Sequence, residues 1–73
     1  MKINDLVTID ENHYIIFSKC KYNNTEFYYL INDKEKKYCF FENKKAILIE
    51  DKNLMDILTP LFIDTFKLHF DIT

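Results

Sequence analysis

The chain of 73 residues contains no glycine, no arginine and no tryptophan, and it has a single proline. Glycine-rich loops that bind phosphate or dinucleotides are therefore excluded. The lack of arginine excludes planar, bidentate recognition of phosphate or guanine. Without glycine, asparagine must supply the positive φ angles of tight turns, which it tolerates better than most other residues.

Long hydrophobic runs are also lacking. No apolar segment approaches the roughly 20 residues that span a bilayer. The first five residues lead into a polar mixture rather than into the apolar region of a signal peptide. We therefore expect a cytoplasmic protein without a membrane-spanning segment.

What is present is the composition of a small globular domain. Hydrophobic residues make up 48% of the chain and aromatic residues 16%, with a formal net charge of -2. This charge argues against a dedicated duplex-DNA binder. Length and composition predict one α+β domain over residues 1–73, with a sheet over 1–50 and a helical segment over 51–70.

A period of two over the first fifty residues predicts four or five strands in an antiparallel meander. In the longest, 14–22, the even-numbered residues form the better core face. The strand 26–32 is apolar on both faces, which is typical of a central strand. Asn23 and Asn24 predict a tight turn. The expected strands cover residues 6–9, 14–22, 26–32, 37–42 and 46–50.

After residue 50 the period changes to that of a helix, with Asp51 as the expected N-cap. Pro60 is expected to interrupt this helix, either by kinking it or by dividing it into two abutting segments, and the second alternative is favoured. Ile63 and Phe70 lie outside its apolar arc and are expected to remain uncovered. The expected arc, about 180° wide, contains Leu54, Met55, Ile57, Leu58, Leu61, Phe62, Phe66 and Leu68.

Residues with catalytic or metal-binding chemistry are few and scattered. His13, Cys20, Cys39 and His69 lack the paired spacing of zinc ligands, so no metal or other cofactor is expected. The cysteines are expected to be small buried residues rather than a disulfide. Ser18 is the one serine and has no nucleophile motif around it. The sequence therefore predicts a protein that is not an enzyme.

Charge is unevenly distributed along the chain. Residues 19–45 carry seven lysines against four acids, whereas residues 46–73 carry two lysines against five acids. Basic, aromatic strands are typical of modules that contact single-stranded nucleic acid, which is one hypothesis for function. Its candidate contacts are Lys19, Lys21, Tyr28, Lys36, Lys37, Lys44 and Lys45.

The favoured hypothesis is a protein-interaction module that uses the uncovered helix surface. Ile63, Phe66 and Phe70 are its candidate contact residues, and the same surface would serve a homodimeric accessory protein. Partner identity does not follow from the residues.

The layout also resembles a group of known proteins. The turn at residues 23–24, the segments 27–31 and 46–51, and the helix with Leu61 and Phe62 are similar to small uncharacterised proteins of low-GC bacteria and their phages and mobile elements. This group includes anti-CRISPR-type inhibitors. The resemblance covers most of the chain and implies a non-enzymatic phage inhibitor that binds and occludes a host-defence nucleoprotein.

Overall fold

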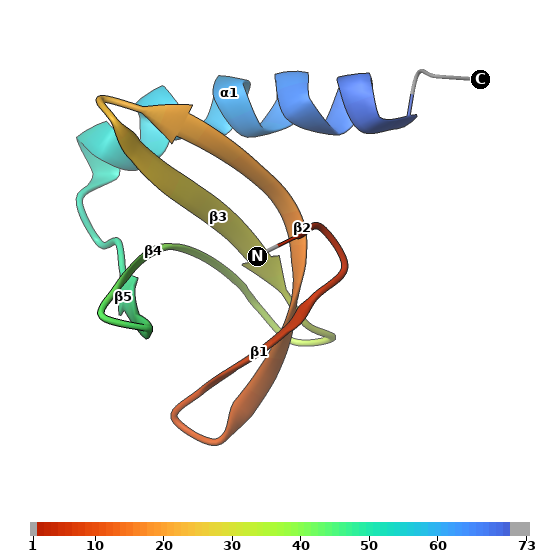
Figure 1. Cartoon of the computed structure of the whole chain (residues 1–73), viewed down its shortest axis with the longest axis vertical. Helices are drawn as coiled ribbons and strands as arrows, with labels where there is room; N and C mark the ends of the chain where they lie inside the picture. The colour runs from red at the N-terminus through yellow and green to blue at the C-terminus, as the bar shows by residue number, and fades with distance from the viewer. Residues whose placement is uncertain (1, 71–73) are drawn as a thin grey trace.

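The computed structural model describes the backbone of residues 2–70 and the side chains of residues 2–68. Five strands precede one helix, as the change of period predicted (Figure 1). The strands pair in the order β1-β2-β3-β4-β5, and every pair is antiparallel. The predicted α+β meander is confirmed. The elements are β1 (Leu6–Ile9), β2 (Asn12–Tyr22), β3 (Thr25–Ile31), β4 (Lys36–Glu42), β5 (Lys45–Leu48) and α1 (Lys52–Phe70).

Three tight hairpin turns form without glycine. Each has two consecutive residues with positive φ, the geometry that matches the twist of antiparallel strands. The predicted turn at Asn23 and Asn24, with φ of 54° and 64°, is one of them. The other two place Glu11 and Lys44 at the second turn position, with φ of 68° and 67°. Neither residue type favours this region, so these turns retain conformational strain.

The sheet separates two apolar clusters. The face opposite the helix is called here the inner face. It carries a cluster, called here the inner cluster, formed by Val7, Tyr14, Ile16, Tyr28, Leu30 and Cys39. On the other face lies the helix-side cluster, formed by Phe27, Ile49, Leu58 and Phe62. The central strand β3 contributes to both clusters, as its apolar character on two faces predicted.

A bulge in β2 changes the expected core face. Ile16 pairs with Leu30 but Ser18 pairs with Tyr29, so Phe17 is an extra residue between two regular stretches. An extra residue reverses the alternation of side chains beyond it. Ile16 therefore belongs to the inner face and Ser18 to the helix face, and the prediction that all even residues of this strand share one face is wrong beyond the bulge.

Helix α1 begins as predicted, because the Oδ1 atom of Asp51 accepts a hydrogen bond from the backbone N–H of Asn53 at 2.9 Å. The expected interruption at Pro60 is not found: the helix is continuous from Lys52 to Phe70. Pro60 has no N–H to donate to the carbonyl of Asp56, and both residues lie on the exposed side of the helix, so no buried bond is lost there. The helix packs mainly on β2 and extends past the sheet (Figure 1).

Candidate functional site: an aromatic cavity between helix and sheet

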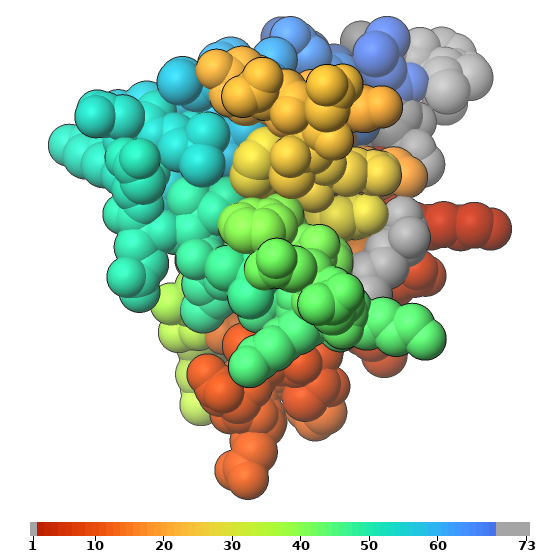
Figure 2. Space-filling view, turned by 60° about the vertical axis from the view of Figure 1, so that its left-hand side comes forward, coloured from red at the N-terminus to blue at the C-terminus, as the bar shows by residue number. Residues whose placement is uncertain are grey.

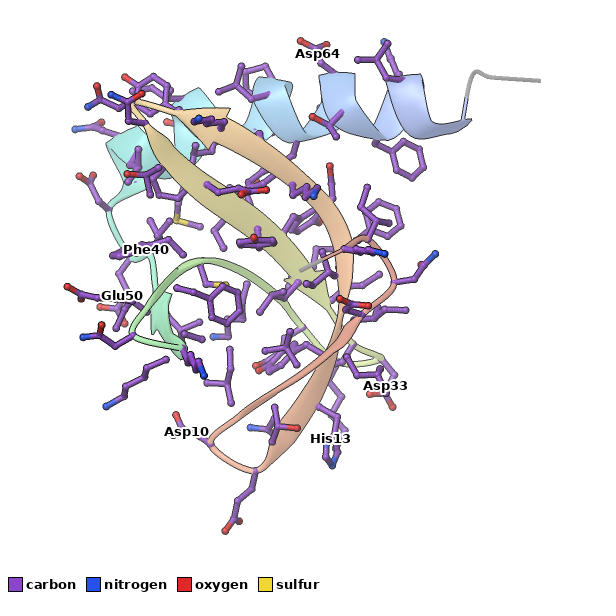
Figure 3. All side chains as sticks on the ribbon, viewed as in Figure 1. Asp10, His13, Asp33, Phe40, Glu50 and Asp64 are labelled. Carbon is purple, nitrogen blue, oxygen red and sulfur yellow. The ribbon has the colours of Figure 1, made fainter. Side chains whose placement is uncertain are left out.

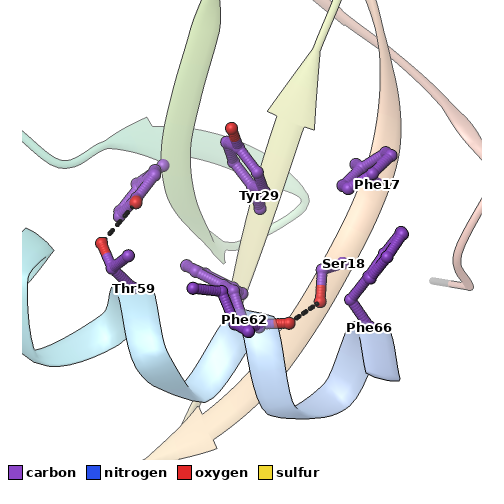
Figure 4. A pocket seen from close by; sticks show the side chains of 8 residues that line it. Phe17, Ser18, Tyr29, Thr59, Phe62 and Phe66 are labelled. Carbon is purple, nitrogen blue, oxygen red and sulfur yellow. Dashed lines mark hydrogen bonds between the residues drawn. The ribbon is translucent and has the colours of Figure 1, made fainter. Parts of the chain in front are cut away.

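A cavity of about 200 Å³ lies between α1 and the face of the sheet that the helix covers (Figure 4). Five of its eight lining residues are aromatic, and all eight are uncharged. It is called here the aromatic cavity. Its lining residues are Phe17, Ser18, Tyr29 and Tyr38 from the sheet and Thr59, Phe62, Ile63 and Phe66 from the helix.

The β2 bulge builds one wall of this cavity. Because of the extra residue, both Phe17 and Ser18 border the cavity on the helix side. The ring of Phe17 stacks on Phe66 with centroids 4.8 Å apart, and it meets the edge of Tyr29 at 5.8 Å. Offset stacks and edge-to-face pairs are the favoured arrangements of aromatic rings. The wall is therefore formed by rings that hold one another in place.

Hydrogen bonds from two sheet hydroxyls, those of Ser18 and Tyr38, join the sheet to helix α1 beside the cavity. Ser18 Oγ donates to the carbonyl oxygen of Phe62 at 2.8 Å, in a fully buried bond. Thr59 Oγ1 donates to the carbonyl of Met55 at 2.8 Å, so Tyr38 is the donor in its 2.6 Å bond to Thr59 Oγ1. Figure 4 shows the hydrogen bonds at Thr59 and at Ser18, one on each side of Phe62. Since these hydroxyls are bonded within the protein, the cavity offers chiefly apolar and aromatic contact.

Two of the three predicted interaction residues belong to this site. Phe66 lines the wall, and Ile63 lies at the rim with 48% of its surface exposed. The side chain of Phe70 lies outside the described residues. Sequence reasoning missed Phe17 and Tyr38, because their place in the cavity depends on the bulge and on how the helix crosses the strands.

A second exposed surface of α1 corrects the expected apolar arc. Ile57 and Leu68, which were expected to face the sheet, are 43% and 72% exposed. The buried side of the helix is centred on Leu58 and Phe62, since a narrow curved sheet covers only part of a 180° arc. Ile57, Leu68 and the half-buried Leu61 between them form a surface called here the outer stripe.

The candidate nucleic-acid residues do not form one platform. Tyr28 is 6% exposed and packs edge-on against Phe41 in the inner face, so it has no free ring surface for a base and is removed from the candidates. Lys19 forms an ion pair with Glu26 at 3.5 Å, across the β2–β3 hairpin.

Lys21 lies in β2 opposite Glu26, and the remaining four candidate lysines are divided between the two ends of β4. Lys36 and Lys37 begin this strand, and Lys44 and Lys45 follow its far end. At a rise of about 3.3 Å per residue, the two groups lie up to about 23 Å apart. Lys37 also lies 3.8 Å from Glu35, which offsets its charge.

The cysteines and the described histidine lie apart from one another. Cys39 belongs to the inner cluster and Cys20 to the edge of the helix-side cluster, so the sheet separates these two free thiols. Burial raises the pKa of each thiol to about 11. His13 projects from the end of the sheet far from the helix, where its ring bonds Thr8 at 3.0 Å (Figure 3). Among the described residues, no three His, Cys, Asp or Glu side chains gather as a metal site would require.

The comparisons with known proteins give no relative: no family model, curated protein or solved structure matches the chain. In the described part of the chain, α1 lacks the apolar length needed to cross a bilayer.

Proposed function

We propose that the protein is a non-enzymatic, cytoplasmic protein-binding module whose aromatic cavity receives an apolar side chain of its partner. The observation that carries this proposal is an uncharged cavity with five aromatic rings and the exposed Ile63 at its rim. Energetically dominant contacts in protein interfaces are anchors of this kind, held in desolvated apolar pockets.

The size of the cavity supports a side-chain anchor over a small-molecule substrate. Its volume of about 200 Å³ is below the roughly 300–1,000 Å³ of typical small-molecule sites. Of the four hydroxyls among the lining residues, those of Ser18, Tyr38 and Thr59 are bonded within the protein, which leaves few polar groups to orient a reacting substrate. Binding and occlusion of a host-defence nucleoprotein, which the resemblance to phage inhibitors implies, is the specific form of this proposal.

Two variants on opposite sides of one helix test the proposal. Ile63→Glu places a charge at the cavity rim, and Ile57→Glu places the same charge at a position of nearly equal exposure, 43% against 48%, on the outer stripe. The protein and both variants are used to capture partners from cells of the native host, with nuclease treatment and mass spectrometry.

We expect Ile63→Glu to lose a captured protein that wild type and Ile57→Glu both retain. Titration of the isotope-labelled protein with p-cresol and indole should move NMR signals of Phe66 and Ile63 but not those of Leu68. Equal capture by both variants, or fragment binding away from the cavity, would contradict the proposal.

The outer stripe favours a second candidate, a homodimeric accessory protein. Ile57 and Leu68 expose apolar surface on one side of α1, and such surface commonly marks a protein interface. Sedimentation equilibrium distinguishes the candidates: a dimer that dissociates in Leu68→Glu but persists in Ile63→Glu would support self-association through the stripe.

A further inference from the structure

A second hollow lies between the two edges of the sheet, away from the aromatic cavity. Within residues 2–70, β1 and β5 each pair with one neighbouring strand. Between them is a cleft of about 530 Å³, called here the edge cleft. Figure 2 shows the β4–β5 turn, in green, beside the orange-red β1–β2 turn. The edge cleft is lined by Thr8, Ile9, Asp10 and residues 44–48.

The directions of the two edges define what fits between them. Strands alternate in direction along an antiparallel meander, so β1 and β5 have the same sense in the order of the sheet, and the twist and curvature of the sheet turn them apart in space (Figure 1). One added strand that runs the opposite way would be antiparallel to both edges. Such a strand would continue the alternation of the sheet and close it into a six-stranded barrel, which removes both open edges.

The backbone of both edges offers hydrogen-bonding groups to this cleft. In a two-residue hairpin, the residues that flank the turn form a hydrogen-bonded pair, and bonding toward the partner strand alternates from there. Ile9 and Lys45 are such flanking residues. The N–H and C=O groups of Thr8, Ala46 and Leu48 therefore point away from their partner strands and toward the cleft.

Side chains at the cleft favour an occupant with alternating apolar residues. Ile9, Ala46 and Leu48 pack at the border of the inner cluster and are only half-buried. Alternate side chains of an added strand would cover them, because successive side chains of a strand point to opposite faces.

The charges that line the edge cleft indicate which kind of added strand it would bind. Two lysines, Lys44 and Lys45, and one acid, Asp10, line the cleft. A second copy of the chain that added its β5 here would carry two more lysines into the cleft, which would increase its positive charge and leave Lys44 and Lys45 without an acidic partner from that copy. An acidic segment would instead neutralise them.

We propose that the edge cleft binds an extended, acidic peptide segment of a partner protein, which adds as a sixth strand between β1 and β5. Strand addition of this kind uses main-chain hydrogen bonds for affinity and alternate side-chain pockets for specificity. This surface is separate from the aromatic cavity and does not depend on the function proposed for it.

Ala46→Pro is the sharpest test. Proline is tolerated in an edge strand where its missing N–H would face away from the sheet, so the fold should survive. The added strand, however, loses a donor. Ala46→Val is the matched control, because it has similar bulk and keeps the N–H.

The probe is a displayed library of seven-residue peptides with β-branched or aromatic residues at alternate positions. We expect selected peptides to be rich in Asp and Glu, to bind wild type and Ala46→Val equally, and to bind Ala46→Pro about tenfold more weakly. Ile63→Glu should not change their affinity, which keeps this test independent of the aromatic cavity.

Hydrogen exchange on the wild-type protein provides a second readout that does not require Ala46→Pro to fold. A selected peptide should slow exchange of the amides of Thr8, Ala46 and Leu48, and N-methylation at its alternate residues should abolish binding. Recovery of no binder, undiminished binding to Ala46→Pro, or protection elsewhere would overturn the proposal. So would a wild-type dimer that Ala46→Pro dissociates, since the occupant would then be a second copy.

Discussion

Deletion of Phe17 tests whether the β2 bulge is an addition to an otherwise regular strand. Ile16 pairs with Leu30 and Ser18 pairs with Tyr29, so removal of the residue between them joins two stretches that are already in register. A deletion in a regular strand would instead turn every following side chain to the opposite face. We therefore expect the Phe17 deletion to fold with both pairings retained.

The expected loss of unfolding free energy in the Phe17 deletion follows from the contacts that Phe17 makes. Phe17 makes two ring pairs, with Phe66 and Tyr29, each worth about 0.5–1.5 kcal/mol beyond its burial. Burial of half a phenylalanine side chain contributes about 1 kcal/mol more. The total loss is about 2–4 kcal/mol, against a total stability of about 4–11 kcal/mol for a domain of this length. The variant should remain folded, with a lower urea midpoint.

Two further variants separate the bulge from the ring. Phe17→Ala removes the same contacts and keeps the bulge, so its free energy of unfolding should lie within about 1 kcal/mol of that of the deletion. Deletion of the half-buried Ile15, where the strand is regular, should prevent folding. Urea denaturation and two-dimensional NMR measure both. An unfolded Phe17 deletion beside a folded Phe17→Ala would refute the reasoning, as would a well-folded Ile15 deletion.

Three further outcomes are expected. Glu11→Gly should raise the free energy of unfolding by about 0.5–1 kcal/mol, because glycine adopts positive φ without strain; Glu11→Ala is the control, and urea denaturation measures both. Burial raises the pKa of the Cys39 thiol to about 11 from 9, so stability is full below pH 9 and should fall between pH 9 and 11. Urea midpoints measured at pH 7, 9 and 10.5 should therefore fall less steeply with rising pH in Cys39→Ala, which lacks this thiol, than in wild type. Fluorescence anisotropy with labelled single-stranded RNA and DNA should show no submicromolar binding at physiological salt; binding that disappears in Lys19→Glu/Lys21→Glu would contradict this.

Local patterns were sufficient to predict the order and type of the elements. The period of two, the Asn23–Asn24 turn and the capping residue Asp51 are each set by neighbours in sequence, and all three were predicted correctly. Strand ends differ from the prediction by no more than two residues. The turns at residues 10–11 and 43–44 begin with Asp10 and Asn43, which are usual turn residues, but Glu11 and Lys44 at the second position are not, and only the paired strands make their positive φ angles necessary.

The features that shape the site depend on contacts between distant segments. Nothing in the residues around Phe17 marks a bulge, because the extra residue is defined by its partners in β3. Pro60 was expected to divide the helix, but proline is tolerated where the carbonyl it leaves unpaired faces water. The exposure of Ile57 and Leu68 likewise follows from the width of the sheet beneath the helix, which the helical period does not encode.

The bulge also explains how one small sheet serves two surfaces. Before Phe17, β2 contributes Tyr14 and Ile16 to the inner cluster that borders the edge cleft; after it, Ser18 fastens the helix that closes the aromatic cavity. Because the two surfaces draw on different faces of the sheet, changes at Ile63 and Ala46 share no contact and should act independently. A partner whose affinity falls by the product of the two single effects in Ile63→Glu/Ala46→Pro would contact both surfaces at once. A double variant no weaker than Ile63→Glu alone would mean that this partner binds through the cavity alone.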